Sequence, residues 1–549
     1  MSSSAVAHSL ATARQVASPR VARSRFPSRA PLRARVAASA SDDASDASEA
    51  VVSSASSDAS AASPPPYAGP PRLVVIGGGF GGLYTALKLD ALDGWKDGVR
   101  PRVTLVDRAE RFVFKPLLYE LVNETMKEWE VCPTFEDLLA PTKIAFHRGD
   151  VASVRPDAGD DAGGVVRLAD GTRLAYDYLV VGAGTVSSVE SVPGAKDHAV
   201  PLSTLEDAQR LAGALRDAET KRLRSESNSA PYEPSFAVVG GGLSGVELAG
   251  VVAERMRAAE GKSRVELLAS SAGIMPESPA GQREAALRRL ESCGVTIRVG
   301  ARATMVGAAT APDPLAPARA TLAWTEAGEE RLGEYDAVCW TVGQKVESPE
   351  SWPFPRSDGG KILTDPTLRV LGQSRVFAVG DAAERRGASS PASSSSSDKN
   401  IADADVSSSS YAAPPPGAPL PSTAQVAFQQ ADYAAWNVWS SVAGRPLLPF
   451  RYQHIGDMMV LGKTDAAVAL PLGDATVDGP LAALLRRAAY LYRMPTDAHR
   501  AKLAGSWLEQ SAKFAAEEGP GILRKLGVPV PPEIERFVND VAGVNKRTP

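Results

Sequence analysis

Two segments of the chain repeat the same pattern, and this repetition limits the folds that the chain can adopt. RLVVI leads into GGGFGGLYTALKL in residues 72–89, and SFAVV leads into GGGLSGVELAGVVAERM in residues 235–256. In each segment a β-branched run enters a glycine cluster, which then opens an apolar helical stripe. A strand that meets a helix through such a turn is the phosphate-binding element of Rossmann-like domains. The sequence therefore predicts an α/β fold with two dinucleotide-binding domains.

The first glycine loop has the spacing Gly77-x-Gly79-x-x-Gly82. The glycines permit a tight turn and a close approach of the backbone to a pyrophosphate, whose charge lies at the helix N-terminus. The spacing alone is weak, because an ordinary glycine-rich turn can match it. Here, however, the next strand ends in Asp107, which can hold a ribose 2′-hydroxyl.

The second loop, Gly240-x-Gly242-x-x-Gly245, repeats the arrangement with a different strand end. Ala269 stands where Asp107 stands in the first unit, so no carboxylate is present to repel a 2′-phosphate. The following Ser270 and Ser271 can donate hydrogen bonds to a phosphate. This favours NADPH over NADH, the alternative being an adenosine end that is only loosely held.

Two such units suggest two bound dinucleotides, a tightly held flavin (FAD) and a nicotinamide donor (NADPH or NADH). A third element agrees with this interpretation. RVFAVGD is a strand that ends in Gly380 and Asp381, and in two-dinucleotide flavoproteins such an aspartate binds the ribityl chain. The alternative is a solvated aspartate after a strand.

Composition excludes several other classes of protein. The formal net charge of −4 argues against nucleic-acid binding. The three cysteines form no CxxC motif and the five histidines are scattered, so we expect no disulfide framework and no metal site. No apolar run approaches the roughly 18 residues needed to span a bilayer.

The N-terminal region has the composition of a targeting segment. Residues 1–40 contain seven arginines, eight serines and no aspartate, glutamate or lysine, as in an organelle transit peptide. Dense serine and alanine without a clean amphipathic helix favour the chloroplast over the mitochondrion; an ordinary disordered tail is the alternative. Residues 41–70 form a predicted disordered linker, and the Ser/Pro-rich residues 388–421 a predicted disordered insertion.

Together, the motifs make the chain resemble the type II NAD(P)H:quinone oxidoreductases, in particular their plastid C-type branch, over residues 71–515. The segments that carry the resemblance are RLVVIGGGFGGLYTALKL, VTLVDRAERFVFKPLLYEL, YDYLVVGAGT, FAVVGGGLSGVELAG, YDAVCWTVG, VFAVGDAAE and STAQVAFQQADYAAWNVW. The resemblance implies electron transfer from NAD(P)H through FAD to a prenylquinone such as demethylphylloquinone or plastoquinone. The insertion before Pro421 departs from the family and puts access to the quinone site in doubt.

The resemblance also divides the chain into parts. The implied division is residues 71–205 and 335–460 for the FAD-binding domain, 206–334 for the NAD(P)H-binding domain and 461–549 for a C-terminal membrane-association segment. Gly184 and Gly343, in YDYLVVGAGT and YDAVCWTVG, are implied cofactor-binding residues. The implied partners are a prenylquinone, a membrane or plastoglobule surface and a second copy of the chain in a homodimer.

Four further residues are candidates for the redox site by resemblance. Glu247 would face the flavin–nicotinamide junction, and Lys115 would border the isoalloxazine ring. Gln425 and Gln429, four residues apart on one helical face, would bind quinone carbonyls or flavin oxygens. The alternative for Glu247 is an acid at a helix start without a chemical role, and for Lys115 a surface lysine. The alternative for the two glutamines is that their amides join the helix to a loop.

The C-terminal segment has the pattern of an amphipathic interfacial helix. In residues 480–493, five apolar residues share one face: Leu481, Leu484, Leu485, Ala488 and Tyr492. Arg486, Arg487 and Arg493 are expected on the opposite face against anionic lipid, with Trp507 in the interface. The alternative is a helix packed on the core, and a second possible function is reduction of a soluble acceptor.

Overall fold

The structure is a computed structural model that describes residues 69–156, 163–225, 232–258, 262–309, 319–386, 420–471 and 475–517. These residues belong to the unit of the chain that begins at Pro66. The predicted transit peptide, nearly all of the predicted linker 41–70 and nearly all of the predicted insertion 388–421 lie outside the described residues.

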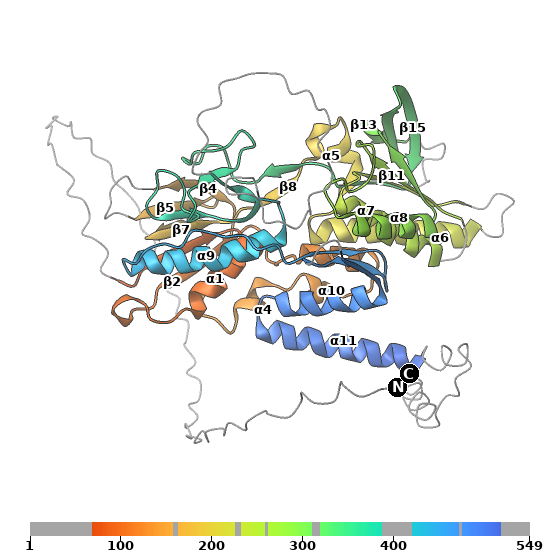
Figure 1. Cartoon of the computed structure of the whole chain (residues 1–549). Coiled ribbons are helices and arrows are strands. Elements are labelled where there is room, and N and C mark those ends of the chain that lie inside the picture. Colours follow the sequence, from red (N-terminus) through yellow and green to blue (C-terminus); the bar gives the residue numbers. More distant parts are fainter. Residues whose placement is uncertain are drawn as a thin grey trace, which may run out of the picture. The chain divides into compact units, whose positions relative to one another are not determined.

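A five-stranded parallel sheet in the order β19-β7-β1-β2-β3 forms the first domain (Figure 1). Its strands are β1 (Arg72–Ile76), β2 (Arg102–Asp107), β3 (Ala145–Arg148), β7 (Tyr178–Val181) and β19 (Val376–Ala378). Leu73 and Val75 pack with helices α1 (Phe80–Ala91) and α9 (Ala424–Val442). Val74 and Ile76 point to the other face, because side chains alternate along a strand. That face is covered by the antiparallel strands β4 (Val151–Arg155), β5 (Gly164–Leu168) and β6 (Arg173–Tyr176).

The second domain repeats this three-layer plan. Its parallel sheet has the order β12-β11-β10-β16-β9. The strands are β9 (Ala199–Pro201), β10 (Ser235–Val239), β11 (Arg264–Ala269), β12 (Val295–Val299) and β16 (Ala337–Trp340). Helices α6 (Leu205–Ser225), α7 (Leu243–Ala258) and α8 (Ala280–Ser292) share one apolar cluster with the sheet. On the other face of the sheet, a second apolar cluster joins it to the antiparallel strands β13 (Arg302–Ala308), β14 (Ala320–Glu326) and β15 (Glu329–Tyr335).

The two domain boundaries differ slightly from those expected. Both β9 and β16 belong to the second sheet, although residues 71–205 and 335–460 were assigned to the first domain. The chain crosses between domains in the antiparallel pair of β8 (Thr185–Ser187) and β17 (Gln344–Val346). Strand patterns alone do not reveal which sheet a short buried strand joins, so the sequence placed the boundaries a few residues too far inside the second domain.

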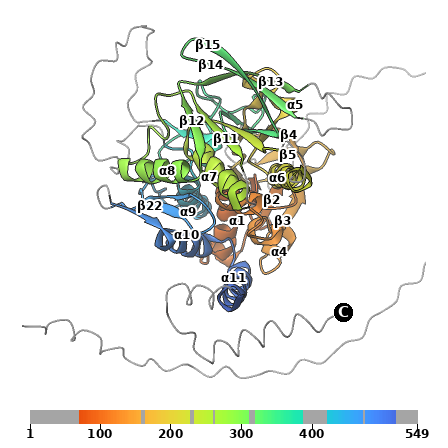
Figure 2. The same cartoon turned by 90° about the vertical axis from the view of Figure 1, so that its right-hand side faces the viewer.

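A third part of the structure, separate from the two parallel sheets, follows α9 in the chain. It consists of an antiparallel sheet of β21 (Asp457–Val460), β22 (Ala466–Ala469) and β23 (Thr476–Gly479), then helices α10 (Pro480–Arg493) and α11 (Asp497–Glu517). The last two helices lie side by side in both views (Figure 1, Figure 2). Among the described residues, no helix combines the length and apolar character needed to cross a bilayer.

Short helices join these layers. They are α2 (Leu118–Val122), α3 (Glu128–Val131), α4 (Phe135–Leu139), α5 (Ala195–His198) and the 3-10 segments Lys115–Leu117 and Gly380–Ala382. Helix α2 of the first domain packs against α6 and α7 of the second. The short helices therefore form part of the contact between the two domains.

Candidate functional site

The first glycine loop has the shape that a dinucleotide phosphate requires. Gly77 has a φ of +94°, and a Cβ atom there would lie 2.2 Å from the carbonyl oxygen of Gly182. A Cβ atom on Gly82 would lie 1.8 Å from the oxygen of Gly77, so both positions need glycine for packing. Gly79 is different, because a Cβ atom there would meet nothing within 4 Å. The loop thus leaves open space at the N-terminus of α1, which has no side-chain cap.

Asp107 lies at the end of β2, beside this loop, as the sequence predicted. Its Oδ2 accepts a hydrogen bond of 2.5 Å from the Gly78 N–H, and its Oδ1 one of 2.7 Å from the Ala109 N–H. Burial raises the pKa of this carboxyl above its usual range, while the two backbone N–H groups oppose that shift. The carboxylate is therefore fixed at the loop, where an adenosine ribose would lie; its contact with a ribose remains a prediction.

The second loop repeats this geometry. A Cβ atom on Gly240 would lie 2.4 Å from Thr341 Oγ1, and one on Gly245 would lie 1.8 Å from the Gly240 oxygen. Gly242, like Gly79, faces open space. The structure therefore provides a second helix N-terminus with room for a phosphate.

Ala269 occupies the position that Asp107 occupies in the first unit. It ends β11, and a Cβ atom on Gly241 would lie 2.4 Å from the Ala269 Cβ, as one on Gly78 would lie close to the Asp107 carboxylate. The Ser271 hydroxyl donates to the Gly273 carbonyl at 2.6 Å, which leaves the exposed Ser270 as the better phosphate donor of the two serines.

Gly380 and Asp381 lie between the first sheet and α9. Gly380 has a φ of +69°, and its N–H donates to the Gln430 Oε1 at 2.6 Å. Asp381 Oδ2 accepts a hydrogen bond of 3.3 Å from the Thr185 hydroxyl. Sequence reasoning missed Gln430, although it stands next to Gln429; the amide is buried on the face of α9 that meets the strand end.

Three other candidate residues lie around these loops. Gly184 and Gly343 both adopt positive φ values, +73° and +75°, where the chain leaves β7 and β16 for the crossing strands. A Cβ atom on Gly343 would approach the Ser188 Cβ to 3.0 Å, while one on Gly184 would face open space. Lys115 is exposed and lies close enough to Glu347 to oppose the rise in the pKa of that carboxyl that burial causes.

The amides of Gln425 and Gln429 bind the segment that follows α9. Gln425 Nε2 donates to the Gly456 carbonyl at 3.0 Å, and its Oε1 accepts from the Tyr452 hydroxyl at 2.6 Å. Gln429 Nε2 donates to the Gln453 carbonyl at 2.7 Å. These bonds are the helix-to-loop role that the sequence left open, and direct contact of either amide with a quinone remains a prediction.

A threonine caps the start of α9. Thr423 is the N-cap, and its hydroxyl accepts a hydrogen bond of 3.3 Å from the Val426 N–H. Threonine is a favoured N-cap because its oxygen satisfies a backbone donor that lacks a helical partner. The cap fixes the first turn of α9 beside Gly380, whose Cβ position would lie 3.7 Å from the Ala427 Cβ.

Glu247 lies at the contact between the two domains. It is the fifth residue of α7. The side chain is buried, its Oε1 accepts from the Val460 N–H at 2.9 Å, and the Tyr119 side chain of α2 lies beside it. Burial raises the pKa of Glu247 to about 7, opposed by Arg486. A carboxyl with this pKa can hold or release a proton near neutral pH.

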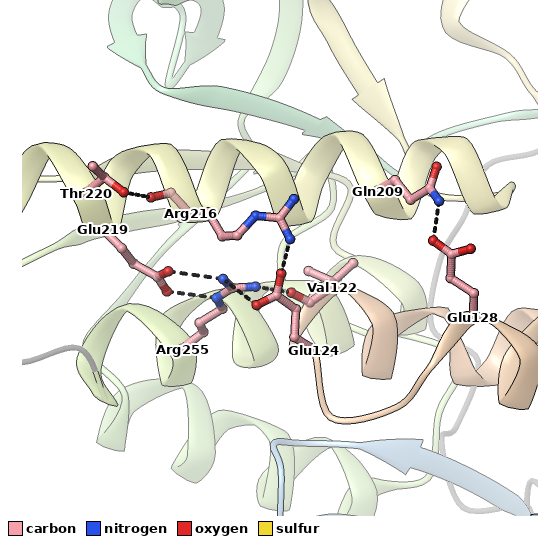
Figure 3. Close-up of polar contacts among 8 residues, drawn as sticks. All are labelled: Val122, Glu124, Glu128, Gln209, Arg216, Glu219, Thr220 and Arg255. Atoms are coloured by element: carbon pink, nitrogen blue, oxygen red, sulfur yellow. Dashed lines mark hydrogen bonds and ion pairs between the residues drawn. The ribbon is translucent and has the colours of Figure 1, made fainter. Parts of the chain in front are cut away.

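A second set of polar contacts joins the domains nearby (Figure 3). Arg255 of α7 donates to both carboxylate oxygens of Glu219 at 2.8 and 3.0 Å. It also donates to the Val122 carbonyl at 2.6 Å and to Glu124 at 3.2 Å (Figure 3). Arg255 therefore holds the end of α2 against α6 and α7.

Helix α10 is oriented differently from what its sequence predicted. Arg486, expected to face lipid, is 2% exposed and pairs with Glu120 of α2 at 3.0 Å. Arg487 and Arg493 are both half-buried, and the Arg493 guanidinium lies over the Phe428 ring, so a contact of these two arginines with lipid remains a prediction. Trp507, expected in the interface, is partly buried against the core. Tertiary pairing with a residue distant in sequence explains the error at Arg486.

The predicted apolar face of α10, in contrast, points away from the core. Leu481, Leu484, Leu485 and Tyr492 are 59%, 65%, 43% and 71% exposed. The face that packs on the protein carries Ala482, Arg486 and Tyr490 instead. This is the reverse of the usual rule for a surface helix, whose apolar stripe faces the core. Helix α10 therefore packs on the core, as the alternative held, but through this face, and the four exposed side chains take no part in that contact.

Comparison with known proteins agrees with this geometry. Residues 71–431 match the family model of the pyridine nucleotide-disulphide oxidoreductases. The chain is 39% identical to the alternative NAD(P)H-ubiquinone oxidoreductase C1, chloroplastic/mitochondrial, of Arabidopsis thaliana, over 80% of this chain and 81% of the relative. It is 38% identical to the demethylphylloquinone reductase NdbB of Synechocystis, over 80% of this chain and 96% of the relative.

A solved structure shows the same fold. The NDH2 of Plasmodium falciparum in complex with NADH superposes with a TM-score of 0.62 at 14% identity, covering 80% of this chain and 98% of that one. The two glycine loops, the strand that ends in Gly380 and Asp381, and the sequence relatives point to one group of enzymes. The chain belongs to the type II NAD(P)H:quinone oxidoreductases, within the pyridine nucleotide-disulphide oxidoreductase fold.

Proposed function

We propose that this protein transfers two electrons from NAD(P)H through FAD to a prenylquinone at a membrane surface. The observation that carries the proposal is the pair of open glycine loops in two domains that meet at a buried carboxyl, Glu247. When bound, FAD supplies the hydride and electron chemistry, and the protein supplies position and electrostatics.

The residues of the first domain fit an FAD. The open space at Gly79 suits the pyrophosphate, and the fixed carboxylate of Asp107 suits the adenosine ribose. Asp381, held by Thr185, would bind the ribityl chain, and Lys115 would favour a negative charge on the reduced ring. Glu247 would hold a proton where the two cofactors meet.

The second domain fits a nicotinamide dinucleotide with a 2′-phosphate. Ala269 places no negative charge beside the loop, and Ser270 is exposed there as a hydrogen-bond donor. We therefore infer that NADPH is accepted at least as readily as NADH.

The electron acceptor is inferred to be a quinone in a membrane. A relay through a redox-active disulfide is disfavoured, because Cys132, Cys293 and Cys339 are free cysteines and burial raises the pKa of Cys132 and of Cys339 to about 12. The exposed leucines of α10 instead provide an apolar surface on a helix that is joined to the site through Arg486. Such a surface binds the boundary between lipid headgroups and acyl chains, where a prenylated substrate is found.

A plastid location agrees with two independent observations. Residues 1–40 have the composition of a transit peptide, and one relative carries the name chloroplastic/mitochondrial while another is cyanobacterial. A prenylquinone of the demethylphylloquinone or plastoquinone class is the substrate that we infer.

The test compares two half-reactions and two acceptors. The FAD-bound protein is mixed anaerobically with NADPH or NADH, and the bleaching of the flavin is followed by stopped-flow absorbance. Turnover is then measured with a short-chain quinone in solution, with a long-tailed prenylquinone in vesicles and with ferredoxin. Bleaching followed by fast vesicle turnover supports the proposal. Equal turnover with ferredoxin and no dependence on lipid would establish the soluble-acceptor alternative.

A further inference from the structure

A buried ion pair joins α10 to α2. Arg486 Nη1 donates to Glu120 Oε1 at 3.0 Å, and Arg486 Nη2 donates to the Pro116 carbonyl at 2.9 Å. Both side chains are almost fully buried, at 3% exposure for Arg486 and 4% for Glu120. Removing one member of such a pair leaves the other charge uncompensated, so the pair determines how the two helices dock.

Helix α2 links this ion pair to Glu247. Tyr119, the residue before Glu120, lies beside Glu247 and Ser244 of α7, against which α2 packs. The other carboxylate oxygen of Glu120 accepts from the Thr125 hydroxyl at 2.6 Å, which fixes the end of α2. Any movement of α2 would therefore move Tyr119 relative to Glu247.

The charged, titratable and hydrogen-bonding groups around Glu247 come from three elements. Arg486 and Tyr490 lie on α10, Tyr119 and Glu120 lie on α2, and β21 contributes the Val460 N–H. Arg486 lowers the pKa of Glu247, and the Glu120 carboxylate raises it by a smaller amount. The two members of the ion pair thus act on Glu247 with opposite signs.

We propose that Arg486 and Glu120 are positioning residues for Glu247: their ion pair seats α10 on α2, holds Tyr119 against Glu247 and sets the local charge. The proposal rests on the proposed function only in giving Glu247 a role in proton transfer. It means that the helix with the exposed leucines is joined through a buried charge to the group that holds the proton.

The test follows the protonation of Glu247 directly. Infrared difference spectra of the oxidised FAD-bound protein are recorded across pH, and the protonated carboxyl band that disappears in Glu247→Gln is followed. Arg486→Met should move the midpoint of this band up by about one pH unit, and Glu120→Gln should move it down. The conservative Arg486→Lys should leave it close to that of the unmodified protein.

Two controls keep the test decisive. Arg255→Met removes another buried arginine that binds α2 but is not among the groups that shift Glu247, and it should leave the midpoint unchanged. Arg486→Met is checked for FAD content and a cooperative melting transition; if it does not fold, the double variant Glu120→Gln/Arg486→Met replaces it and should show a smaller upward shift.

Shifts of opposite sign would support the proposal, because a purely structural role would not move the two midpoints in opposite directions. Shifts of the same sign, or no shift in either folded variant, would overturn it. Since the infrared titration needs neither NAD(P)H nor quinone, the proposed function can fail while this inference stands, and the reverse also holds.

Discussion

Replacing Leu481 and Leu484 by glutamine should weaken membrane binding without disturbing the fold. The two side chains are 59% and 65% exposed, so neither contributes much to the core. Fully burying a leucine is worth about 1.5–3 kcal/mol, and moving the exposed parts of both into lipid should therefore favour binding by about 2–4 kcal/mol. This corresponds to roughly a 30- to 700-fold change in vesicle affinity.

Co-sedimentation with vesicles measures this change, and the chain offers a matched control. Leu223 of α6 and Leu332 of β15 are 64% and 68% exposed, but they lie in the second domain. The double variant Leu223→Gln/Leu332→Gln should pellet with vesicles like the unmodified protein. If both double variants pellet equally, the leucines of α10 do not meet lipid. Glutamine introduces no charge, so a difference cannot arise from electrostatic repulsion by anionic lipid.

Truncating the chain at Gly479 would be a poorer test of the same idea. The truncation removes Arg486, the ion-pair partner of the Glu120 carboxylate, together with the helix that carries it. It also removes the Tyr490 ring, which packs edge-on against Phe114 with centroids 5.4 Å apart. A loss of membrane binding by such a protein would therefore be confounded by damage to the first domain.

Five further variants test the site. Ala269→Glu should depress NADPH use selectively by repelling the 2′-phosphate; an equal fall with NADH would show that this position does not read the 2′ group. Gln425→Leu removes its bonds to the segment after α9, worth about 1–3 kcal/mol, and should slow quinone reduction while flavin reduction by NADPH stays near normal. Because burial raises the folded-state pKa of Glu247 from 4.5 to about 7, stability should fall as pH rises between these values, and Glu247→Gln should raise the melting temperature at pH 8 but not at pH 4. Gly82→Ala should lower the melting temperature sharply, whereas Gly79→Ala should fold normally but retain less FAD on gel filtration.

The glycine loops could be predicted because their determinants are local. Strand, turn and helix follow one another within about twenty residues. The last glycine of each loop answers a steric demand inside the same segment, because a Cβ atom on Gly82 or Gly245 would meet the carbonyl oxygen of the loop's first glycine. The same is true of Thr423, whose cap depends on the next three residues. The position of Asp107 could be predicted from one further strand, β2, because parallel pairing of β2 with β1 brings the end of β2 to the loop.

The role of Arg486 could not be predicted in this way. A helical projection of α10 correctly groups the leucines on one side and the arginine on the other, but it does not say which side meets the protein. The partner of Arg486 is Glu120, 366 residues earlier in the chain, and nothing in the local pattern of either segment indicates the pair.

The reversed orientation of α10 has a physical explanation that unites these observations. A helix that turned its leucines inward would gain apolar burial but would leave Glu120 and Glu247 in the core without a positive charge. With Arg486 inward, the ion pair compensates Glu120, and the leucines are left for a second apolar phase. A lone buried pair is weak evidence for stability, since hydrophobic replacements are often as stable. The ion pair between Arg486 and Glu120 therefore acts by specifying which face of α10 docks on the protein. As a consequence, Leu485 lies on the outer face of the helix, at 43% exposure.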